Sequence, residues 1–287
     1  MDEVRQAVQI CPQRIAQAIM RQPHSQLEEV RMRLGRPPTY LQNGQERQLV
    51  PQEVCTSDLQ EVLDRASASS AYAAQQMLKN GFLTIPGGHR LGLCGRGVYK
   101  NGEFYTLTEL SSVSLRIARS IFGVADSIRS YLWTHPQSTL IIAPPGRGKT
   151  TLLRDLIRQL SDRFSWRIGL VDERSEVAAC LDGKAQLDVG KSTDILTAIC
   201  KAEGIEMLLR TMNPQWIAVD EITAEADVEA ICRASYCGVR FLATAHAATV
   251  KELSERPIYR GLMQSRIFGN VVRIDAQRNL HMEVAND

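Results

Sequence analysis

The stretch Ala143-Pro144-Pro145-Gly146-Arg147-Gly148-Lys149-Thr150-Thr151 decides the fold of this chain of 287 residues. A short apolar segment, residues 139–143, precedes it and is typical of a buried strand. After it, apolar residues recur at helical spacing, at positions 152, 153, 156, 157 and 160. A strand, a glycine-containing turn and a helix in that order are the context of a P-loop (Walker A motif), here with Ala143 in place of the usual first glycine.

The chemistry of this loop follows from its residue types. Gly146 and Gly148 allow the backbone to turn so that its N–H groups face phosphate oxygens. The ammonium of Lys149 reaches the β- and γ-phosphates, and the hydroxyl of Thr150 is a ligand for Mg²⁺. The helix N-terminus adds a partial positive charge. We therefore expect ATP and Mg²⁺ as cofactors, with the nucleotide held by Pro145, Gly146, Arg147, Gly148, Lys149, Thr150 and Thr151.

Carboxylates that could complete a hydrolytic site follow another apolar segment. Residues 216–220 are typical of a buried strand, and they end in Asp220-Glu221. A P-loop alone binds nucleotide, whereas hydrolysis needs an oriented metal and an activated water. We expect Asp220 to hold Mg²⁺ through water, as in a Walker B strand, and Glu221 to orient or activate the attacking water. The alternative is a strand that ends in surface acids.

Two further strand candidates end in polar side chains. Residues 167–172 run into Asp172-Glu173-Arg174, and residues 240–244 run into Ala245-His246. In open α/β sheets, ligands gather at the carboxyl ends of the strands. We therefore expect Glu173 near the nucleotide, and His246 to sense the γ-phosphate through a hydrogen bond. A solvated strand end and a structural histidine are the alternatives.

Strand and helix candidates alternate through residues 121–287, which predicts a parallel sheet covered by helices. We expect this part to be an α/β, RecA-like ATPase domain. Its predicted helices cover residues 149–162, 192–212 and 224–236, and a terminal hairpin (271–274 and 280–284) closes the sheet.

Residues 1–120 have a different pattern and predict a smaller α+β domain. An amphipathic pattern over residues 3–20 predicts a helix, and Asn43-Gly44 predicts a hairpin turn. A second helix is expected over residues 58–79, capped at Ser57-Asp58. Strand-like material follows at residues 82–99 and 113–117.

Composition narrows the class of protein. The hydrophobic fraction of 44% is enough for a packed core, and the formal net charge of +2 gives little support for nucleic-acid binding. No apolar run approaches the roughly 18–20 residues of a membrane-spanning helix, and the first residues do not look like a signal peptide. The seven cysteines contain no CxxC pair, so we expect reduced thiols in the cytosol: Cys11, Cys55, Cys94, Cys180, Cys200, Cys232 and Cys237.

Four motifs in order resemble the secretion-ATPase superfamily of type II and type IV systems: the P-loop, the acidic box at 172–176, the strand at 216–221 and the histidine box at 244–246. Residues 204–214 also resemble the helix that precedes Walker B in that superfamily. A closer resemblance, over nearly the whole chain, is to the stage III sporulation ATPases of endospore-forming bacteria. It rests on residues 29–37, 85–92, 171–176 and 219–222.

The resemblance implies an ATPase motor of the AAA+ type that assembles as a hexameric ring. It implies action in the mother cell, at the membrane facing the forespore, with membrane proteins of a channel complex as partners and no nucleic acid. Secretion ATPases use arginines of the N-terminal domain at the nucleotide, and Arg90 and Arg116 occupy strand positions that resemble those arginines.

Two departures from the superfamily pattern bear on the chemistry. Many secretion ATPases have glycine where Asp220 stands, so metal binding here is expected to be more conventional. The acidic box is Asp-Glu-Arg rather than the usual acidic pair, which leaves the choice of catalytic carboxylate between Glu221 and Glu173 open. Two other functions also stay open: a RecA-like ATPase stimulated by nucleic acid, and an ATP-binding scaffold that docks a membrane complex.

Overall fold

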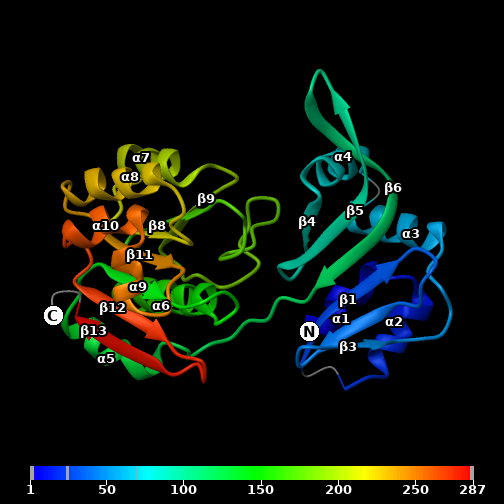
Figure 1. Cartoon of the computed structure of the whole chain (residues 1–287), viewed down its shortest axis with the longest axis horizontal. Coiled ribbons are helices and arrows are strands. Elements are labelled where there is room, and N and C mark those ends of the chain that lie inside the picture. The colour runs from blue at the N-terminus through cyan, green and yellow to red at the C-terminus, as the bar shows by residue number, and fades with distance from the viewer. Residues whose placement is uncertain (1–2, 24–25, 69, 285–287) are drawn as a thin grey trace. The chain divides into compact units, whose positions relative to one another are not determined.

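The structure is a computed structural model that describes residues 3–23, 26–68 and 70–284, and the chain divides into two units (Figure 1). The first unit holds residues 1–119 together with the short segment 179–186. The second unit holds residues 120–178 and 187–287. The P-loop and all the predicted carboxylates lie in the second unit.

The first unit is built on a six-stranded antiparallel sheet with the order β3-β2-β1-β6-β5-β4. Its strands are β1 (Leu27–Arg33), β2 (Thr39–Gln42), β3 (Gln45–Gln48), β4 (Phe82–Ile85), β5 (His89–Lys100) and β6 (Glu103–Arg116). Its helices are α1 (Glu3–Ala7), the 3₁₀ helix η1 (Val8–Ile10), α2 (Gln13–Met20), α3 (Thr56–Ala66) and α4 (Ala71–Asn80). One apolar core joins the helices to the sheet.

The predicted hairpin at Asn43-Gly44 is confirmed, with both residues at positive φ between β2 and β3. The prediction of one continuous helix over residues 3–20 is wrong, because this segment forms separate helices. It breaks at Cys11, which is extended because the following Pro12 has no N–H and restricts the residue before it.

The predicted helix over residues 58–79 is also two helices, since α3 ends at Ala66 and Ala68 has a φ of +49°. The predicted start, with a cap at Ser57-Asp58, is also slightly late. Helix α3 begins at Thr56, and its N-cap is Cys55, whose N–H donates to the side chain of Asp58. The strand predicted at 113–117 is only the end of the longer β6.

The second unit is built on a seven-stranded sheet with the order β13-β12-β7-β11-β10-β8-β9. All neighbours pair in parallel except the terminal hairpin of β12 and β13. The strands are β7 (Thr139–Ile142), β8 (Ile168–Asp172), β9 (Thr193–Thr197), β10 (Trp216–Val219), β11 (Arg240–Ala245), β12 (Asn270–Ile274) and β13 (Leu280–Val284). The helices are α5 (Asp126–Thr134), α6 (Lys149–Phe164), α7 (Lys201–Thr211), α8 (Glu225–Ser235), α9 (Val250–Glu255) and α10 (Pro257–Gln264).

Helices cover both faces of this sheet, because alternate strand residues are buried on opposite sides. Ile217, Val219 and Phe241 share a core with residues of α7, α8 and α10, whereas the apolar side of α6 packs against β7 and β11 outside that core. Figure 1 shows α7 and α8 side by side. This arrangement leaves the carboxyl ends of the parallel strands to carry polar groups.

One prediction for this unit is wrong in part. Residues 192–212 were expected to be helical, but β9 occupies their first part and pairs in parallel with β8. The β-branched Thr193, Ile195 and Thr197 favour the strand. The helices α5, α9 and α10 were not predicted. Among the described residues, no helix has both the length and the apolar character that crossing a bilayer requires.

Candidate nucleotide site

The P-loop connects β7 to α6 at the carboxyl edge of the parallel sheet. Gly146 has a φ of +73° and Gly148 a φ of +94°, in the left-handed region that favours glycine. A Cβ built at either position would meet no atom within 4 Å. The backbone conformation, rather than a lack of space, therefore requires these two glycines.

Lys149 is the first residue of α6, and its side chain turns back under the loop. Its ammonium donates to the carbonyl oxygens of Ala143 (2.9 Å) and Pro144 (3.2 Å), and it lies 2.8 Å from Nδ1 of His246. Burial lowers the pKa of Lys149, while the nearby charges of Asp220 and Glu221 oppose that shift. The lysine is thus fixed at the loop, with acids within electrostatic reach.

Asp220 joins three elements through its two carboxylate oxygens. The hydroxyl of Thr150 donates to one oxygen (2.7 Å), and the hydroxyl of Thr244 donates to the other (2.6 Å). The parallel register of β10 and β11 pairs Val219 with Ala243, which places Asp220 beside Thr244. Although β11 lies between the P-loop strand and β10, the carboxylate of Asp220 still reaches the P-loop threonine.

Glu221 has an unusual backbone conformation for a residue with a side chain. Its φ is +57°, and its N–H donates to the hydroxyl of Thr244 (2.8 Å). Its Oε1 lies 2.9 Å from Nε2 of His246, and its Oε2 lies 3.5 Å from a guanidinium nitrogen of Arg174. Strained backbone of this kind persists where its surroundings hold it, and such positions are common at functional sites.

Asp172 organises the loop that follows β8. Its carboxylate accepts the backbone N–H groups of Glu176, Val177 and Ala178 at 2.8–3.1 Å. Burial raises the pKa of Asp172 in spite of these three hydrogen bonds, and the charge of Asp220 raises it further. Arg154, which lies on α6, donates to the carbonyl oxygens of Glu176 and Val177. Asp172 therefore holds the acidic box in shape.

Glu173 lies beside Asp172 and pairs with the ammonium of Lys201. These residues line a cavity of about 20 Å³ together with Arg174, Glu176, Asp220 and Glu221. A cavity of this size has room for about one water molecule. The two candidate catalytic carboxylates, Glu173 and Glu221, therefore face one small shared space.

The other residues of the P-loop that were predicted to hold the nucleotide are Pro145, Arg147 and Thr151. Arg147 donates to the carbonyl oxygen of Ala276 (3.0 Å), beyond β12. Pro145 is exposed in the loop, and Thr151 is half-buried in the first turn of α6. Their contact with a nucleotide stays a prediction.

Arg90 and Arg116 are directly opposite each other on β5 and β6 of the first unit. The guanidinium of Arg90 lies over the ring of Phe82 (4.1 Å to the centroid), and Nε of Arg116 lies 3.6 Å from a carboxylate oxygen of Glu29. The register thus makes them a cross-strand pair. Their role at a nucleotide stays a prediction.

Three residues of the site were missed from the sequence. Thr244 was read only as part of a strand end, and Arg154 and Lys201 only as helix positions. Thr244 depends on the register of β10 and β11, which the sequence does not reveal. Lys201 is the first residue of α7, but the helix was predicted to begin at residue 192, so the position of this lysine at a helix N-terminus was not apparent from the sequence.

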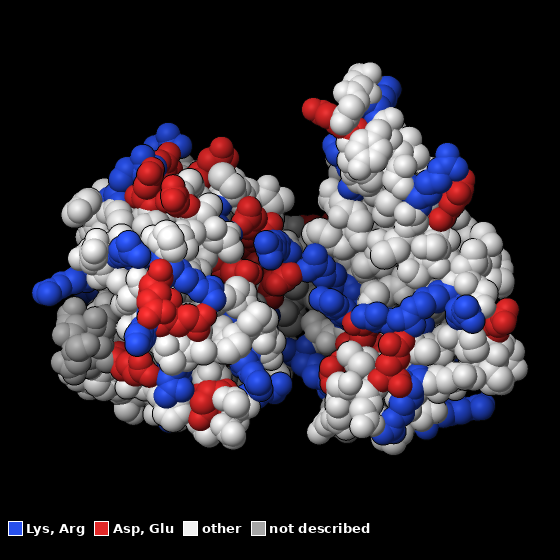
Figure 2. Space-filling view, viewed as in Figure 1, with Lys and Arg blue, Asp and Glu red and all other residues white. Residues whose placement is uncertain are grey.

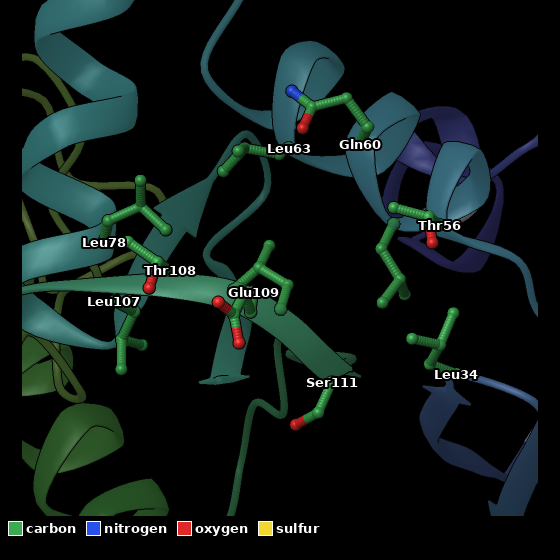
Figure 3. Close-up of a pocket in the computed structure, with 11 residues that line it drawn as sticks. Leu34, Thr56, Gln60, Leu63, Leu78, Leu107, Thr108, Glu109 and Ser111 are labelled. Carbon is green, nitrogen blue, oxygen red and sulfur yellow. The ribbon is translucent and has the colours of Figure 1, made fainter. Parts of the chain in front are cut away.

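A larger hollow lies in the first unit, between α3, α4 and β6 (Figure 3). Its volume is about 710 Å³, and most of its lining is leucine, including Leu63, Leu78 and Leu107. Glu109 is the one carboxylate among the described residues that line it. Its described lining residues include no lysine and no pair of acids like that at the P-loop edge.

Comparison with known proteins supplies the wider context. The family model described as "Sporulation stage III, protein AA" matches residues 1–282. Stage III sporulation protein AA of Bacillus subtilis (strain 168) is 37% identical over 279 residues, covering 94% of this chain and 91% of that protein.

Two solved structures share the fold. The pilus retraction motor PilT with bound ADP superposes with a TM-score of 0.62 at 16% identity, covering 91% of this chain and 80% of that chain. The ATPase DotB of Legionella pneumophila superposes with a TM-score of 0.54 at 14% identity, covering 90% and 75%. At these identities the likeness shows the fold alone. It confirms the predicted α/β class, a RecA-like P-loop domain with a smaller α+β domain before it.

Proposed function

The chain belongs to the sporulation stage III protein AA family, and from that premise we propose that it is an ATPase that hydrolyses ATP during sporulation. The observation that carries the proposal is the convergence of a P-loop and two strand ends. Lys149 contacts His246, His246 contacts Glu221, and the hydroxyl of Thr150 contacts Asp220.

The oxygen atoms at this edge suit a magnesium–nucleotide complex. Mg²⁺ is commonly bound by one or two protein oxygens together with substrate phosphates, and Thr150 and Asp220 supply a hydroxyl and a carboxylate 2.7 Å apart. Within the described residues, no group of three or more His, Cys, Asp or Glu side chains could hold a metal alone. Thr150 and Asp220 would therefore hold Mg²⁺ jointly with the phosphates, and the ion would supply charge neutralisation there.

The side chains divide the remaining work. Lys149 would exchange its carbonyl contacts for phosphate oxygens and stabilise the charge on the transferring group. Glu221 or Glu173 would orient the attacking water, since both line the same cavity. His246 would report phosphate occupancy to Glu221 through its two ring nitrogens.

We further propose that the enzyme acts as a homohexameric motor. It would energise assembly or operation of a mother cell–forespore channel, docked on the membrane proteins of that complex. Arg90 and Arg116 would complete a nucleotide site in the ring. Native mass spectrometry with and without ATP tests the assembly: six copies are expected with ATP, and a monomer under both conditions would contradict it.

Two rival functions are separated by simple assays. The formal net charge of +2 gives the nucleic-acid rival little support, and on the viewed face of the second unit in Figure 2 acidic and basic side chains are mixed. Strong stimulation of turnover by DNA would favour that rival. Full rescue of sporulation by a hydrolysis-dead variant would favour a scaffold.

The test of hydrolysis is Glu221→Gln, which keeps the shape of the side chain and removes its charge. The variant is expected to bind ATP and retain it without turnover. Glu225→Gln, on the exposed start of α8, is the matched control and is expected to turn over normally. Normal turnover by Glu221→Gln would contradict this role and shift the catalytic carboxylate to Glu173.

A further inference from the structure

Lys201 stands in an unfavourable place for a lysine. It is the first residue of α7, where the positive end of the helix dipole repels a cation. Its side chain is only 6% exposed, so the ammonium has also lost most of its hydration. Its ammonium bonds the carboxylate of Glu173, which compensates for both effects. A residue that breaks local rules in this way is more often functional than structural.

Two glycines fix the position of Lys201 over the acidic box. A Cβ on Gly204 would lie 2.6 Å from a methyl carbon of Val171, and a Cβ on Gly169 would lie 2.7 Å from a methyl carbon of Leu208. Helix α7 therefore approaches β8 as closely as glycine permits. Lys201 is three residues before Gly204 and so lies on the same helix face. Because β8 ends at Asp172, this face delivers the ammonium to Glu173.

The charge of Lys201 matters because the cavity beside it is crowded with acids. Among the described residues, five carboxyl groups and two basic side chains line that cavity: Asp172, Glu173, Glu176, Asp220 and Glu221 against Arg174 and Lys201. The side chain of Arg174 is 60% exposed, whereas that of Lys201 is buried. A charge away from solvent is screened less, so Lys201 is the stronger countercharge.

The two candidate catalytic carboxylates differ in how many of their oxygen atoms already have a partner. Both oxygens of Glu221 have a basic neighbour, His246 or Arg174. Lys201 contacts Oε2 of Glu173, and within the described part of the chain Oε1 has no hydrogen-bond partner. Glu173 therefore keeps an acceptor atom for a water molecule at the cavity.

We propose that Lys201 is a positioning residue for ATP hydrolysis, which holds Glu173 with one carboxylate oxygen available to orient the attacking water. The inference rests on the proposed function and deepens it. Among the described residues, Lys201 forms no hydrogen bond or ion pair with the P-loop residues that would bind phosphate. Its loss should therefore change turnover and leave nucleotide affinity alone.

The first experiment measures steady-state ATP hydrolysis by the full-length protein with Lys201→Met, Lys201→Arg and the control Lys251→Met, an exposed lysine on α9. For Lys201→Met, kcat is expected to fall about 10- to 100-fold, as for a misplaced catalytic group, with KM for ATP nearly unchanged. Lys201→Arg keeps the charge and is expected to retain more turnover than Lys201→Met. Full turnover by Lys201→Met would overturn the proposal.

A double-mutant cycle separates positioning from a merely structural role. In a Glu173→Gln background, Lys201→Met is expected to cause no further loss of kcat. The same fold-loss in both backgrounds would overturn the proposal. Gly204→Ala is a second probe, which keeps the lysine side chain but displaces it from Glu173, because the added methyl pushes α7 away from Val171. It is expected to lower kcat in the same direction, and unchanged kcat would count against the proposal.

The wild-type protein and Lys149→Ala complete the experiment. If the wild type shows no turnover that depends on Lys149, the proposed function fails and takes this inference with it. If wild-type turnover depends on Lys149 and Lys201→Met is unimpaired, only the role of Lys201 fails.

Discussion

Nδ1 of His246 lies 2.8 Å from the ammonium nitrogen of Lys149. The other ring nitrogen lies 2.9 Å from the carboxylate of Glu221. A neutral imidazole with its hydrogen on Nε2 accepts from the lysine and donates to the glutamate, so it satisfies both neighbours. The P-loop lysine and a candidate catalytic carboxylate are thus connected through one ring, which comes from a third strand end.

Replacement of that ring should separate binding from hydrolysis. We expect His246→Ala to lower kcat about 10- to 100-fold, because Glu221 and Lys149 lose their common partner and the geometry relaxes. The Kd for ATP should change much less. Phosphate release and fluorescent-nucleotide titration measure the two quantities. His281→Ala, an exposed histidine on the terminal hairpin, is the control, and equal turnover by both variants would contradict the prediction.

Thr244 stabilises the strand ends that carry the acids. Thr244→Val removes the acceptor of the Glu221 N–H and the donor to Asp220. We expect the free energy of unfolding to fall by about 1–3 kcal/mol, the usual effect of leaving buried polar groups unpaired. Urea denaturation measures it. Thr223→Val, on an exposed position nearby, should have little effect, and equal stability of both variants would show that the bonds contribute nothing.

Glu29 gives the first unit a pH-dependent stability. Burial raises the pKa of Glu29, but hydrogen bonds from Arg31 and Ser114 and the charges of Arg31 and Arg116 outweigh it, so the net pKa lies below the ordinary 4.5. A carboxyl group with a lower pKa in the folded state stabilises the fold above its unfolded pKa, and this contribution is lost as pH falls through the folded value.

Glu29→Gln is therefore expected to lower the free energy of unfolding at pH 7 by about 1–3 kcal/mol, and the difference from wild type should shrink as pH falls below the ordinary pKa of 4.5. Urea denaturation at a series of pH values measures this. Glu103→Gln, on an exposed position of β6, provides the comparison. A difference that does not depend on pH would refute the explanation.

The parts of the site that were predictable are local in sequence. The P-loop is one uninterrupted stretch, and Asp220-Glu221 and His246 each follow a short apolar strand, so the rule for strand ends in α/β sheets locates them. The break at Pro12 was also readable, because proline restricts its own residue and the one before it. That signal was outweighed by the apolar periodicity around it.

The other contacts of the site depend on the register between neighbouring strands and on the close approach of a helix to a strand. Neither can be read from the residue type at one position of the sequence. Asp220 meets Thr244 because Val219 pairs with Ala243. Lys201 reaches Glu173 because Gly169 and Gly204 bring a helix and a strand together. The strand β9 was mistaken for helix because its five residues lie on a half-buried edge, where periodicity is a weak signal.

ATP hydrolysis by wild type and Lys149→Ala in the presence of Mg²⁺ tests the central claim most directly. Lys149 is buried at the loop, where its ammonium contacts two loop carbonyl oxygens and His246. We predict turnover by the wild type, normal turnover by Lys251→Met, and loss of turnover by Lys149→Ala to the background rate. Appreciable turnover by Lys149→Ala would contradict the account.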